Sequence, residues 1–190
     1  ECRVGQSPCA GLGAAGGDYL ASLQMRMKIG FDDASHLVRL SQLTQKTNQF
    51  NLTTRRYDEH QMQQFMQDKD WLVAHFSLAD VFGDSGVVGL ALLRKLAPRQ
   101  AELDTFLMSC RVIGREAECA FLHALLRRLA EQGVTEVNAL YAPTAKNALA
   151  KDFLSEQGFE HLGDGRYRRD LHGKPPKHAA DFPIDIQLSV

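Results

Sequence analysis

The sequence predicts an α/β (α+β) domain in which a mixed central sheet is flanked by helices. Two apolar stretches, 71–78 and 86–93, are joined by the turn-rich segment DVFGDS, which is typical of an antiparallel hairpin. A third strand at 103–109 is followed by an amphipathic helix and by a strand at 136–141, and strand–helix–strand units favour parallel pairing. Antiparallel and parallel pairs in one chain indicate a mixed sheet.

The elements before this hairpin are a strand and two helices. Residues 1–24 are rich in Gly and Ala and are expected to form a linker or a frayed end, with at most a short helix leading into a strand at 25–31. Asp32 or Asp33 can cap the first long helix, which ends near Asn48. The remaining elements are expected as a helix at 58–68 capped by Asp58, a helix that stops at Gly133, a helix at 144–157 and a hairpin of 159–162 with 166–171.

Composition excludes several classes of protein. The net charge of −1, without a long basic run, argues against nucleic-acid binding. No apolar stretch approaches the roughly 18 residues of a membrane span. The four cysteines (Cys2, Cys9, Cys110 and Cys119) lack metal-ligand spacing and are too few for a disulfide framework in a chain of 190 residues. We therefore expect no metal site and a location in the reducing cytoplasm.

The segment DTFLMSCRVIGRE, residues 104–116, predicts an anion site. A strand runs through a turn at Gly114 into a helix, and such a junction presents backbone N–H groups and the positive end of a helix dipole. Arg111 and Arg115 add two cations. Glu116 places a carboxylate at the helix start, so a single phosphate is favoured over a pyrophosphate. The alternative is a plain capped turn.

The order of elements, with two motifs, resembles the GNAT N-acyltransferase superfamily. In that fold the loop R/Q-x-x-G-x-G/A after the fourth strand holds the pyrophosphate of an acyl-CoA or the phosphate of a phosphopantetheine; Arg111 and Gly114 match it, and Glu116 replaces its last small residue. The second motif of the fold is an Asn followed by an aromatic residue and a terminal Gly-Phe pair. It is matched by Asn147, Phe153, Gly158 and Phe159. The resemblance implies a GNAT-like domain at 25–171, followed by an extended tail at 172–190.

Three segments resemble, more closely, the C-terminal half of FkbH-like proteins: 39–57, 104–116 and 141–159. In that two-domain family a haloacid-dehalogenase-type domain precedes the GNAT-like domain, and the protein loads glyceryl units from bisphosphoglycerate onto an acyl carrier protein in polyketide biosynthesis. The DxDxT/N motif of the preceding domain is absent from these 190 residues. The resemblance therefore implies acyl handling here, with phosphate chemistry supplied by a domain outside this chain.

Cys110 is the candidate nucleophile. It ends a strand directly before the predicted phosphate loop, and cations and a helix N-terminus favour the reactive thiolate form of a cysteine. Its alternative is a small buried hydrophobe, the role we expect for Cys119. Strand alternation would place Asp104 on the same face as Phe106, Met108 and Cys110, where it could act as a base or orient substrate hydroxyls, or form a structural pair with an arginine.

Other polar residues are candidate binding groups. His75, in mid-strand, is a second candidate base, although a lone strand histidine is more often a hydrogen-bonded core residue. Lys146 and Asn147 open a helix that flanks the pantetheine arm in GNAT folds, and they join Arg111, Gly114 and Arg115 as the phosphopantetheine-binding set. A polar segment is expected to bind the hydroxylated acyl group, unless it is a loop of satisfied Asx turns: Asn48, Gln49, Asn51, Thr53, Thr54 and Arg55.

Three functions follow. The first is acyl transfer, with a glyceryl group held on Cys110 and passed to the phosphopantetheine thiol of a carrier protein; no tightly bound cofactor is needed. The second is a catalytically silent module that docks the carrier protein for a neighbouring phosphatase-like domain. The third is an acyl-CoA-dependent N-acetyltransferase, against which Glu116 argues.

Overall fold

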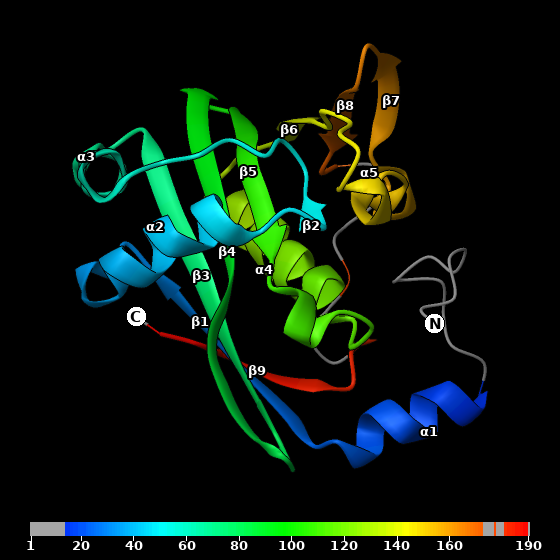
Figure 1. The fold of residues 1–190 in the computed structure, drawn as a ribbon. Coiled ribbons are helices and arrows are strands. Elements are labelled where there is room, and N and C mark those ends of the chain that lie inside the picture. The colour runs from blue at the N-terminus through cyan, green and yellow to red at the C-terminus, as the bar shows by residue number, and fades with distance from the viewer. Residues whose placement is uncertain (1–13, 173–176, 178–180, 190) are drawn as a thin grey trace.

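A mixed nine-stranded sheet is the centre of the fold (Figure 1). The computed structural model describes residues 14–172, 177 and 181–189. The strand order is β7-β8-β6-β5-β4-β3-β1-β9, and β2 pairs with β5 beside this path. The strands are β1 (Met25–Phe31), β2 (Phe50–Asn51), β3 (Trp71–Asp80), β4 (Gly83–Ala97), β5 (Gln100–Met108), β6 (Glu136–Leu140), β7 (Glu160–Gly163), β8 (Arg166–Asp170) and β9 (Ile184–Leu188).

The predicted pairing is confirmed. β3, β4 and β5 form an antiparallel meander, and β5 and β6 pair in parallel across the helix between them. β6, β8 and β7 are antiparallel, as the predicted hairpin requires.

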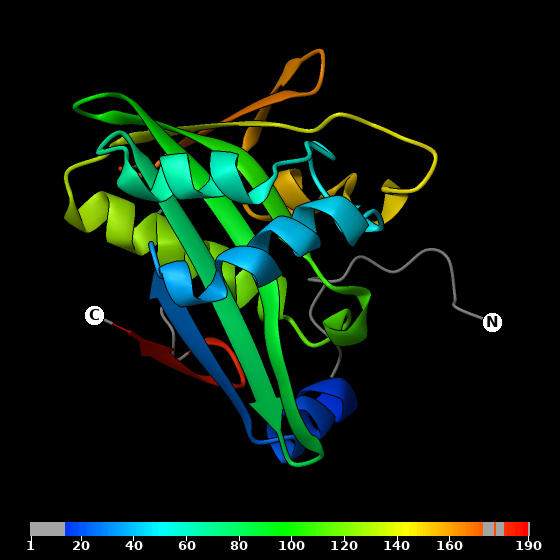
Figure 2. The same ribbon diagram turned by 60° about the vertical axis from the view of Figure 1, so that its left-hand side comes forward.

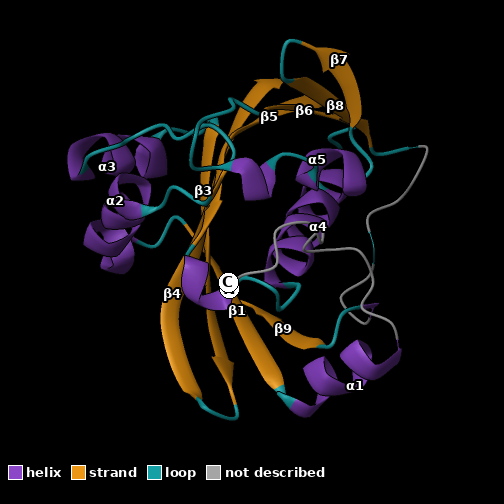
Figure 3. Cartoon of the chain, turned by 45° about the vertical axis from the view of Figure 1, so that its right-hand side comes forward, coloured by secondary structure: helices purple, strands orange, loops and turns teal. Residues whose placement is uncertain are grey.

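Helices cover both faces of the sheet (Figure 2 and Figure 3). α2 and α3 lie on one face, where Leu40, Leu43 and Met62 pack against Leu90 and Leu107. α4 lies on the other face, over a core that includes four aromatic rings: Phe76, Phe106, Phe121 and Phe153. The helices are α1 (Ala14–Ser22), α2 (Leu37–Lys46), α3 (Glu59–Gln67), α4 (Ala117–Glu131) and α5 (Phe153–Glu156), with short 3₁₀ turns η1 (Ala34–His36), η2 (Cys110–Val112) and η3 (Ala148–Ala150).

Local sequence signals explain where these helices begin. Asp58 and Gln61 form the capping box of α3, each side chain bonding the other residue's backbone N–H. Asp33, and not Asp32, caps the turn before α2 by accepting from the N–H of Ser35 at 2.9 Å. Asp32 instead accepts from the N–H of Val73 at 2.9 Å and so ties this corner to β3.

The strands β5 and β6 separate after a short parallel contact, and the segment from Phe50 to Leu52 lies in the opening between them. Their pairing covers only Gln100–Leu103 of β5. Further along, β2 pairs with the end of β5. The N–H of Leu52 donates to the carbonyl of Phe106 (3.1 Å), and its own carbonyl accepts from the N–H of Ala142 (2.8 Å). The segment from Phe50 to Leu52 thus bridges the two diverging chains.

Three expectations about secondary structure are wrong. The helix predicted at 144–157 is broken into η3 and α5, and Leu149, expected to face inward, is 43% exposed. The tail after 172 does not merely run over the surface, because β9 adds to the sheet beside β1 in parallel. The segment before residue 25 contains α1, the short helix that the sequence allowed, and Leu20 and Leu23 are buried in the core, so this part of the segment is not a frayed linker. Residues 1–13 lie outside the described residues.

Cys119 is buried, as expected, but it also forms a disulfide, which the cysteine count did not predict. In the described part of the chain, no helix combines the length and hydrophobicity needed to cross a membrane.

Candidate functional site

The end of β5 carries a free cysteine. Ser109 follows the strand, and its N–H donates to the carbonyl of Val88 at 2.8 Å, which attaches this corner to β4. Cys110 then opens the turn η2 with an exposed, free thiol. Cys110 is therefore not the buried hydrophobe that the sequence left open as its alternative.

The outer stripe of α2 faces this corner. Arg39, Gln42 and Lys46 are spaced by three and four residues, which places them on one side of a helix. The neighbouring stripe, with Leu40, is buried against the sheet and fixes the helix rotation. Arg39 is held in place because its Nε donates to the carbonyl of Val87 at 3.0 Å.

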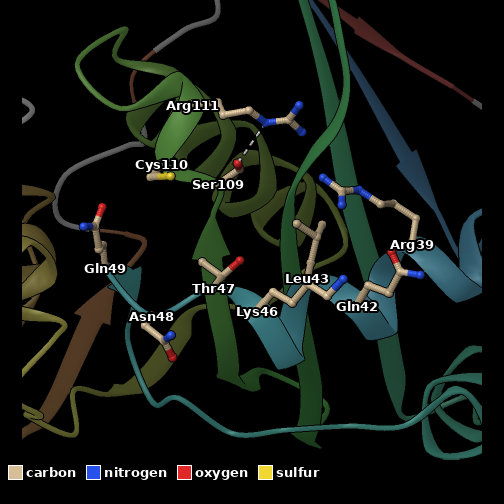
Figure 4. A pocket seen from close by; sticks show the side chains of 10 residues that line it. All are labelled: Arg39, Gln42, Leu43, Lys46, Thr47, Asn48, Gln49, Ser109, Cys110 and Arg111. Atoms are coloured by element: carbon tan, nitrogen blue, oxygen red, sulfur yellow. Dashed lines mark hydrogen bonds between the residues drawn. The ribbon is translucent and has the colours of Figure 1, made fainter.

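A cavity of about 550 Å³ lies between α2 and η2 (Figure 4). Cys110 and Arg111 lie on one side of it, and the α2 side chains lie on the other. None of the described residues that line it is acidic. The lining residues are Arg39, Gln42, Leu43, Lys46, Thr47, Asn48, Gln49, Ser109, Cys110 and Arg111.

Three cations in this lining have no acidic partner. Within the described part of the chain, Arg39, Lys46 and Arg111 take part in no ion pair. The pKa of Arg39 is lowered, first by burial and then by repulsion from Arg111. Among the described residues, the one hydrogen bond of the Arg111 side chain runs from its Nε to the hydroxyl of Ser109, at 3.4 Å. An anion bound between these side chains would relieve their repulsion, so the cavity suits a phosphate or a carboxylate.

The cavity joins four residues singled out in the sequence: Cys110, Arg111, Asn48 and Gln49. The three polar residues of α2, Arg39, Gln42 and Lys46, were not predicted from the sequence as site residues. The signal for them was present, because a polar stripe at 39, 42 and 46 lies on a helix whose other stripe is apolar.

The predicted phosphate loop is only partly available. Gly114 adopts a φ of +83°, so its role is to make the turn, as predicted. Arg115 forms an ion pair with Asp80, whose side chain is buried, and does not line the cavity. Glu116 is the N-cap residue of α4. Its backbone has the left-handed helical conformation, with a φ of +59°, and its side chain makes no capping hydrogen bond. The pairing of Arg115 argues against its assignment to a phosphate.

Asp104 is the centre of a buried network rather than a free base. Its carboxylate accepts from Tyr57 Oη (2.8 Å), from Thr105 Oγ1 (2.9 Å) and from the guanidinium of Arg55. Thr53 Oγ1 donates to the Asp104 backbone carbonyl at 3.2 Å. Burial, followed by the hydrogen bond to Asp104, raises the pKa of Tyr57 to about 12. Arg55 and Thr53 therefore serve this network and do not line the cavity, contrary to their predicted role in acyl binding.

The predicted facing of Asp104 is wrong with respect to Phe106 and Met108, although Asp104 and Cys110 both lie on the α2 side of the sheet. The register between β4 and β5 shifts at this residue, since Leu92 pairs with Thr105 while Leu93 pairs with Leu103. The extra residue turns Asp104 towards Tyr57 and the α2–α3 side of the sheet. Phe106 and Met108 pack on the opposite side, with α4, so alternation across the bulge fails.

The loop between α2 and α3 contains the Asx turn that the sequence left open as its alternative. Asn51 is fully buried; its amide donates to the carbonyl of Thr47 (3.0 Å), and its Oδ1 accepts from the N–H groups of Thr53 (3.3 Å) and Thr54 (2.9 Å). Thr54 is left-handed, with a φ of +52°. Asn51, Thr53 and Thr54 thus shape the loop that carries Asn48 and Gln49 to the cavity. This structural role replaces the predicted role of Asn51, Thr53 and Thr54 in acyl binding.

Asn147 is likewise structural. The side chain is 0% exposed, and its Nδ2 donates to the carbonyls of Asn51 and Ala142, both at 2.9 Å. Its Oδ1 accepts from the N–H of Thr144 (2.7 Å) and from Tyr141 Oη (3.3 Å). The side chain of Asn147 makes all of its hydrogen bonds within the fold, which argues against its predicted role in phosphopantetheine binding. Lys146 is exposed and does not line the cavity.

His75 lies on β3, away from the cavity. It is 5% exposed, and burial, with repulsion from His36, lowers its pKa to about 4. It packs edge-on against the ring of His36, with 4.8 Å between centroids. The residue that the sequence offered as a second base is therefore a neutral imidazole outside the cavity.

The fold is that of the GNAT acyltransferases. An acetyltransferase of the GNAT family from Staphylococcus aureus Mu50 superposes with a TM-score of 0.58 at 14% identity, over 76% of this chain and 99% of the other. The ribosomal-protein-S18-alanine N-acetyltransferase of Escherichia coli gives 0.55 at 18% identity, over 75% and 88%. Rv2747 from Mycobacterium tuberculosis, solved in complex with CoA and NLQ, gives 0.51 at 18% identity, over 69% and 70%.

No protein-family model matches the sequence, and no curated protein matches it. At these identities the likeness shows the fold alone, and the chemistry has to be argued from the cavity.

Proposed function

We propose that this domain transfers an acyl group to the phosphopantetheine thiol of a carrier protein, holding it in transit as a thioester on Cys110. The observation that carries the proposal is the position of Cys110: a free, exposed thiol in a cavity whose charged lining residues, among those that the structure describes, are Arg39, Lys46 and Arg111. A substrate with a reactive carbonyl and an attached phosphate would match this combination. Following the resemblance to FkbH-like proteins, we propose a glyceryl group as the cargo and an acyl carrier protein as the acceptor.

The chemistry balances without a further reactant. The Cys110 thiolate attacks the carbonyl carbon of the donor, a new C–S bond forms, and the donor's thiolate or phosphate leaves with its electron pair. In the second half, the deprotonated phosphopantetheine thiol of the carrier attacks the Cys110 thioester, and Cys110 leaves as the thiolate. Thioester exchange needs no oxidant and has no large driving force in either direction.

The lining residues divide between the two ends of such a substrate. Arg39, Lys46 and Arg111 would bind the phosphate of the phosphopantetheine, and the amides of Asn48 and Gln49 would bind the hydroxyl groups of a glyceryl unit. The phosphate-processing domain of the haloacid-dehalogenase type would be a separate partner. A cytoplasmic location is part of the same proposal.

The structure offers less support for an acyl-CoA-dependent N-acetyltransferase. The opening between β5 and β6 is bridged by Leu52, and Glu116 keeps a carboxylate at the start of α4. His75 and Asp104, the two predicted bases, do not line the cavity. A docking module without catalysis would use the same cations, because carrier proteins present a phosphate on their arm.

The test is transfer from a small thioester. The chain is incubated with the glyceryl thioester of N-acetylcysteamine and followed by intact-protein and peptide mass spectrometry, for the wild type and for Cys110→Ser. We expect a glyceryl adduct mapped to Cys110, absent from the variant and discharged by a phosphopantetheinylated carrier protein.

Three other results would point elsewhere. An equal adduct in the Cys110→Ser protein would move the nucleophile to another residue. Carrier binding without any adduct would favour the docking module. Consumption of acetyl-CoA with an amine acceptor, unchanged in Cys110→Ser, would favour the N-acetyltransferase.

A further inference from the structure

Two histidines and an aspartate meet at the start of α2. Asp33, His36 and His75 each offer one ligand atom, and these three atoms lie within 4.8 Å of one another. The carboxylate Oδ2 of Asp33 is 3.7 Å from Nε2 of His36. This is the only such group of three among the described residues, and it lies outside the cavity around Cys110.

His75 supplies the independent sign of a ligand. Its Nδ1 is buried and has no hydrogen-bond partner among the described residues, although the residue is only 5% exposed. Buried polar atoms are nearly always hydrogen-bonded, so an orphaned ring nitrogen requires an explanation. Histidine is the commonest metal ligand in proteins, and it binds a metal ion through a ring nitrogen.

The backbone holds the other two ligands in position. Asp33 uses Oδ1 to cap η1 through the N–H of Ser35, which leaves Oδ2 directed to His36. The N–H of His36 donates to the carbonyl of Asp33 at 3.2 Å, and this closes the turn that carries both side chains.

A glycine makes room for the third ligand. Gly30 pairs with His75 across β1 and β3, and a Cβ on Gly30 would lie 2.5 Å from Cε1 of the ring. The imidazole therefore lies against bare backbone, in a position that no other residue at 30 would permit without displacing the ring.

We propose that Asp33, His36 and His75 bind a divalent first-row transition metal, with Zn²⁺ as the reference ion. Two imidazoles and a carboxylate form a ligand set that suits such ions, and three protein ligands leave a position for water. Metal–ligand bonds of about 2.0–2.2 Å set the donors of a tetrahedral site roughly 3.5 Å apart, so closing the set requires movements of about 1 Å. Asp33 and His36 are half-exposed and can supply them.

The site would fasten the first turn of α2 to β3. Arg39 follows His36 by one helical turn, and Lys46 by three, so a bound metal would hold the helix that forms one wall of the cavity. The proposal stands on the ligand geometry alone and is independent of the role of Cys110.

The experiment titrates ZnCl₂ into the untagged, EDTA-treated full chain by calorimetry, with Co²⁺ absorption as a second readout. We expect one ion per chain and a visible Co²⁺ spectrum with tetrahedral intensity. Asp33→Asn retains the cap acceptor but removes the charged ligand, and His36→Ala removes a half-exposed ring; each should weaken binding more than about 100-fold, since loss of even an outer partner of a ligand costs about 10- to 100-fold.

Two further variants separate the site from general effects. Gly30→Ala keeps all three ligands but displaces the His75 ring, and it should weaken Zn²⁺ binding while His60→Ala, on the exposed side of α3, leaves it unchanged. Amide hydrogen exchange in 36–46 should slow on adding Zn²⁺. Substoichiometric binding, or binding that Asp33→Asn and His36→Ala leave intact, would overturn the proposal.

Discussion

The side-chain amide of Asn147 donates to the backbone carbonyl of Asn51 at 2.9 Å. This contact joins the loop after β6 to β2, which is paired with β5. Together with the hydrogen bonds of Leu52 to both sides, it holds the opening between β5 and β6 closed by the protein's own backbone. In the proposed function, the acyl group would therefore enter on the other side of β2, where Cys110 and α2 enclose the cavity.

Replacing Asn147 by Ala should destabilise the protein. The change removes hydrogen bonds to Asn51, Ala142 and Thr144 at a fully buried position, and each buried group left without a partner costs about 1–3 kcal/mol. We expect the free energy of unfolding in urea to fall by about 3 kcal/mol. Lys146→Ala, next to it and exposed, should change that free energy by less than about 0.5 kcal/mol. An Asn147→Ala protein of normal stability that fails to take up phosphopantetheine would restore the binding role predicted from the sequence.

The cations of the cavity should bind phosphopantetheine jointly. Arg39→Gln, Lys46→Gln and Arg111→Gln each remove one charge from a site whose described lining residues include no acid. Each should weaken binding about tenfold, the equivalent of about 1.4 kcal/mol. The affinity is measured by calorimetry at two salt concentrations, and the wild type should show the steeper salt dependence. Lys151→Gln, exposed beyond η3, is the matched control. Equal affinity in all four variants would show that the phosphate does not bind in this cavity.

Most of the fold could be predicted from the sequence because it depends on local sequence signals. The capping residues at Asp33 and Asp58, the turn between β3 and β4, and the apolar stripe of α4 each fix an element within about a dozen residues. The helix predicted at 144–157 failed because Asn147, deep in the fold, uses its side chain to hold an irregular loop, a tertiary effect that periodicity does not report.

The site could be predicted only in part, because several of its residues are brought together by tertiary contacts that local sequence patterns do not show. Cys110 and Arg111 were identified because they are adjacent in the sequence, and the segment with Asn48 was identified by its composition. The facing of Asp104 depended on strict alternation, which the register shift in β5 breaks. His36 and His75 are 39 positions apart, so only the pairing of β1 with β3 and the start of α2 bring their rings together.

Asp104 should matter for stability more than for chemistry. Asp104→Asn removes the buried charge that accepts from Tyr57 and Arg55, and we expect a loss of about 3 kcal/mol in the free energy of unfolding. Tyr57→Phe should cost about 1.5 kcal/mol, and the double variant less than the sum of the two, because both remove the same hydrogen bond. The rate of Cys110 acylation should stay close to that of the wild type wherever the variants are folded. A large fall in that rate at unchanged stability would make Asp104 the base that strand alternation suggested.

His123 should make the protein less stable in acid. Its Nδ1 accepts from the N–H of Lys177 at 2.8 Å, so the ring hydrogen lies on Nε2, which faces Oε1 of Gln157 at 3.0 Å. Burial is the largest cause that lowers the pKa of this ring to about 4, from 6.5 in the unfolded chain. Between these values the unfolded state binds more protons, and the free energy of unfolding should therefore fall as the pH drops from 6.5 through 4. Protonation would also set an N–H on Nδ1 against the N–H of Lys177.

The contribution of His123 is the difference between wild type and His123→Gln in urea unfolding at several pH values. The variant carries no titrating ring, so the wild type should lose stability relative to it below pH 6.5, and the difference should be constant from pH 7 upward. A difference that stays constant from pH 7 down to pH 4 would mean that His123 titrates alike in the folded and unfolded chains, and the hydrogen bond from Lys177 would then not hold the ring neutral.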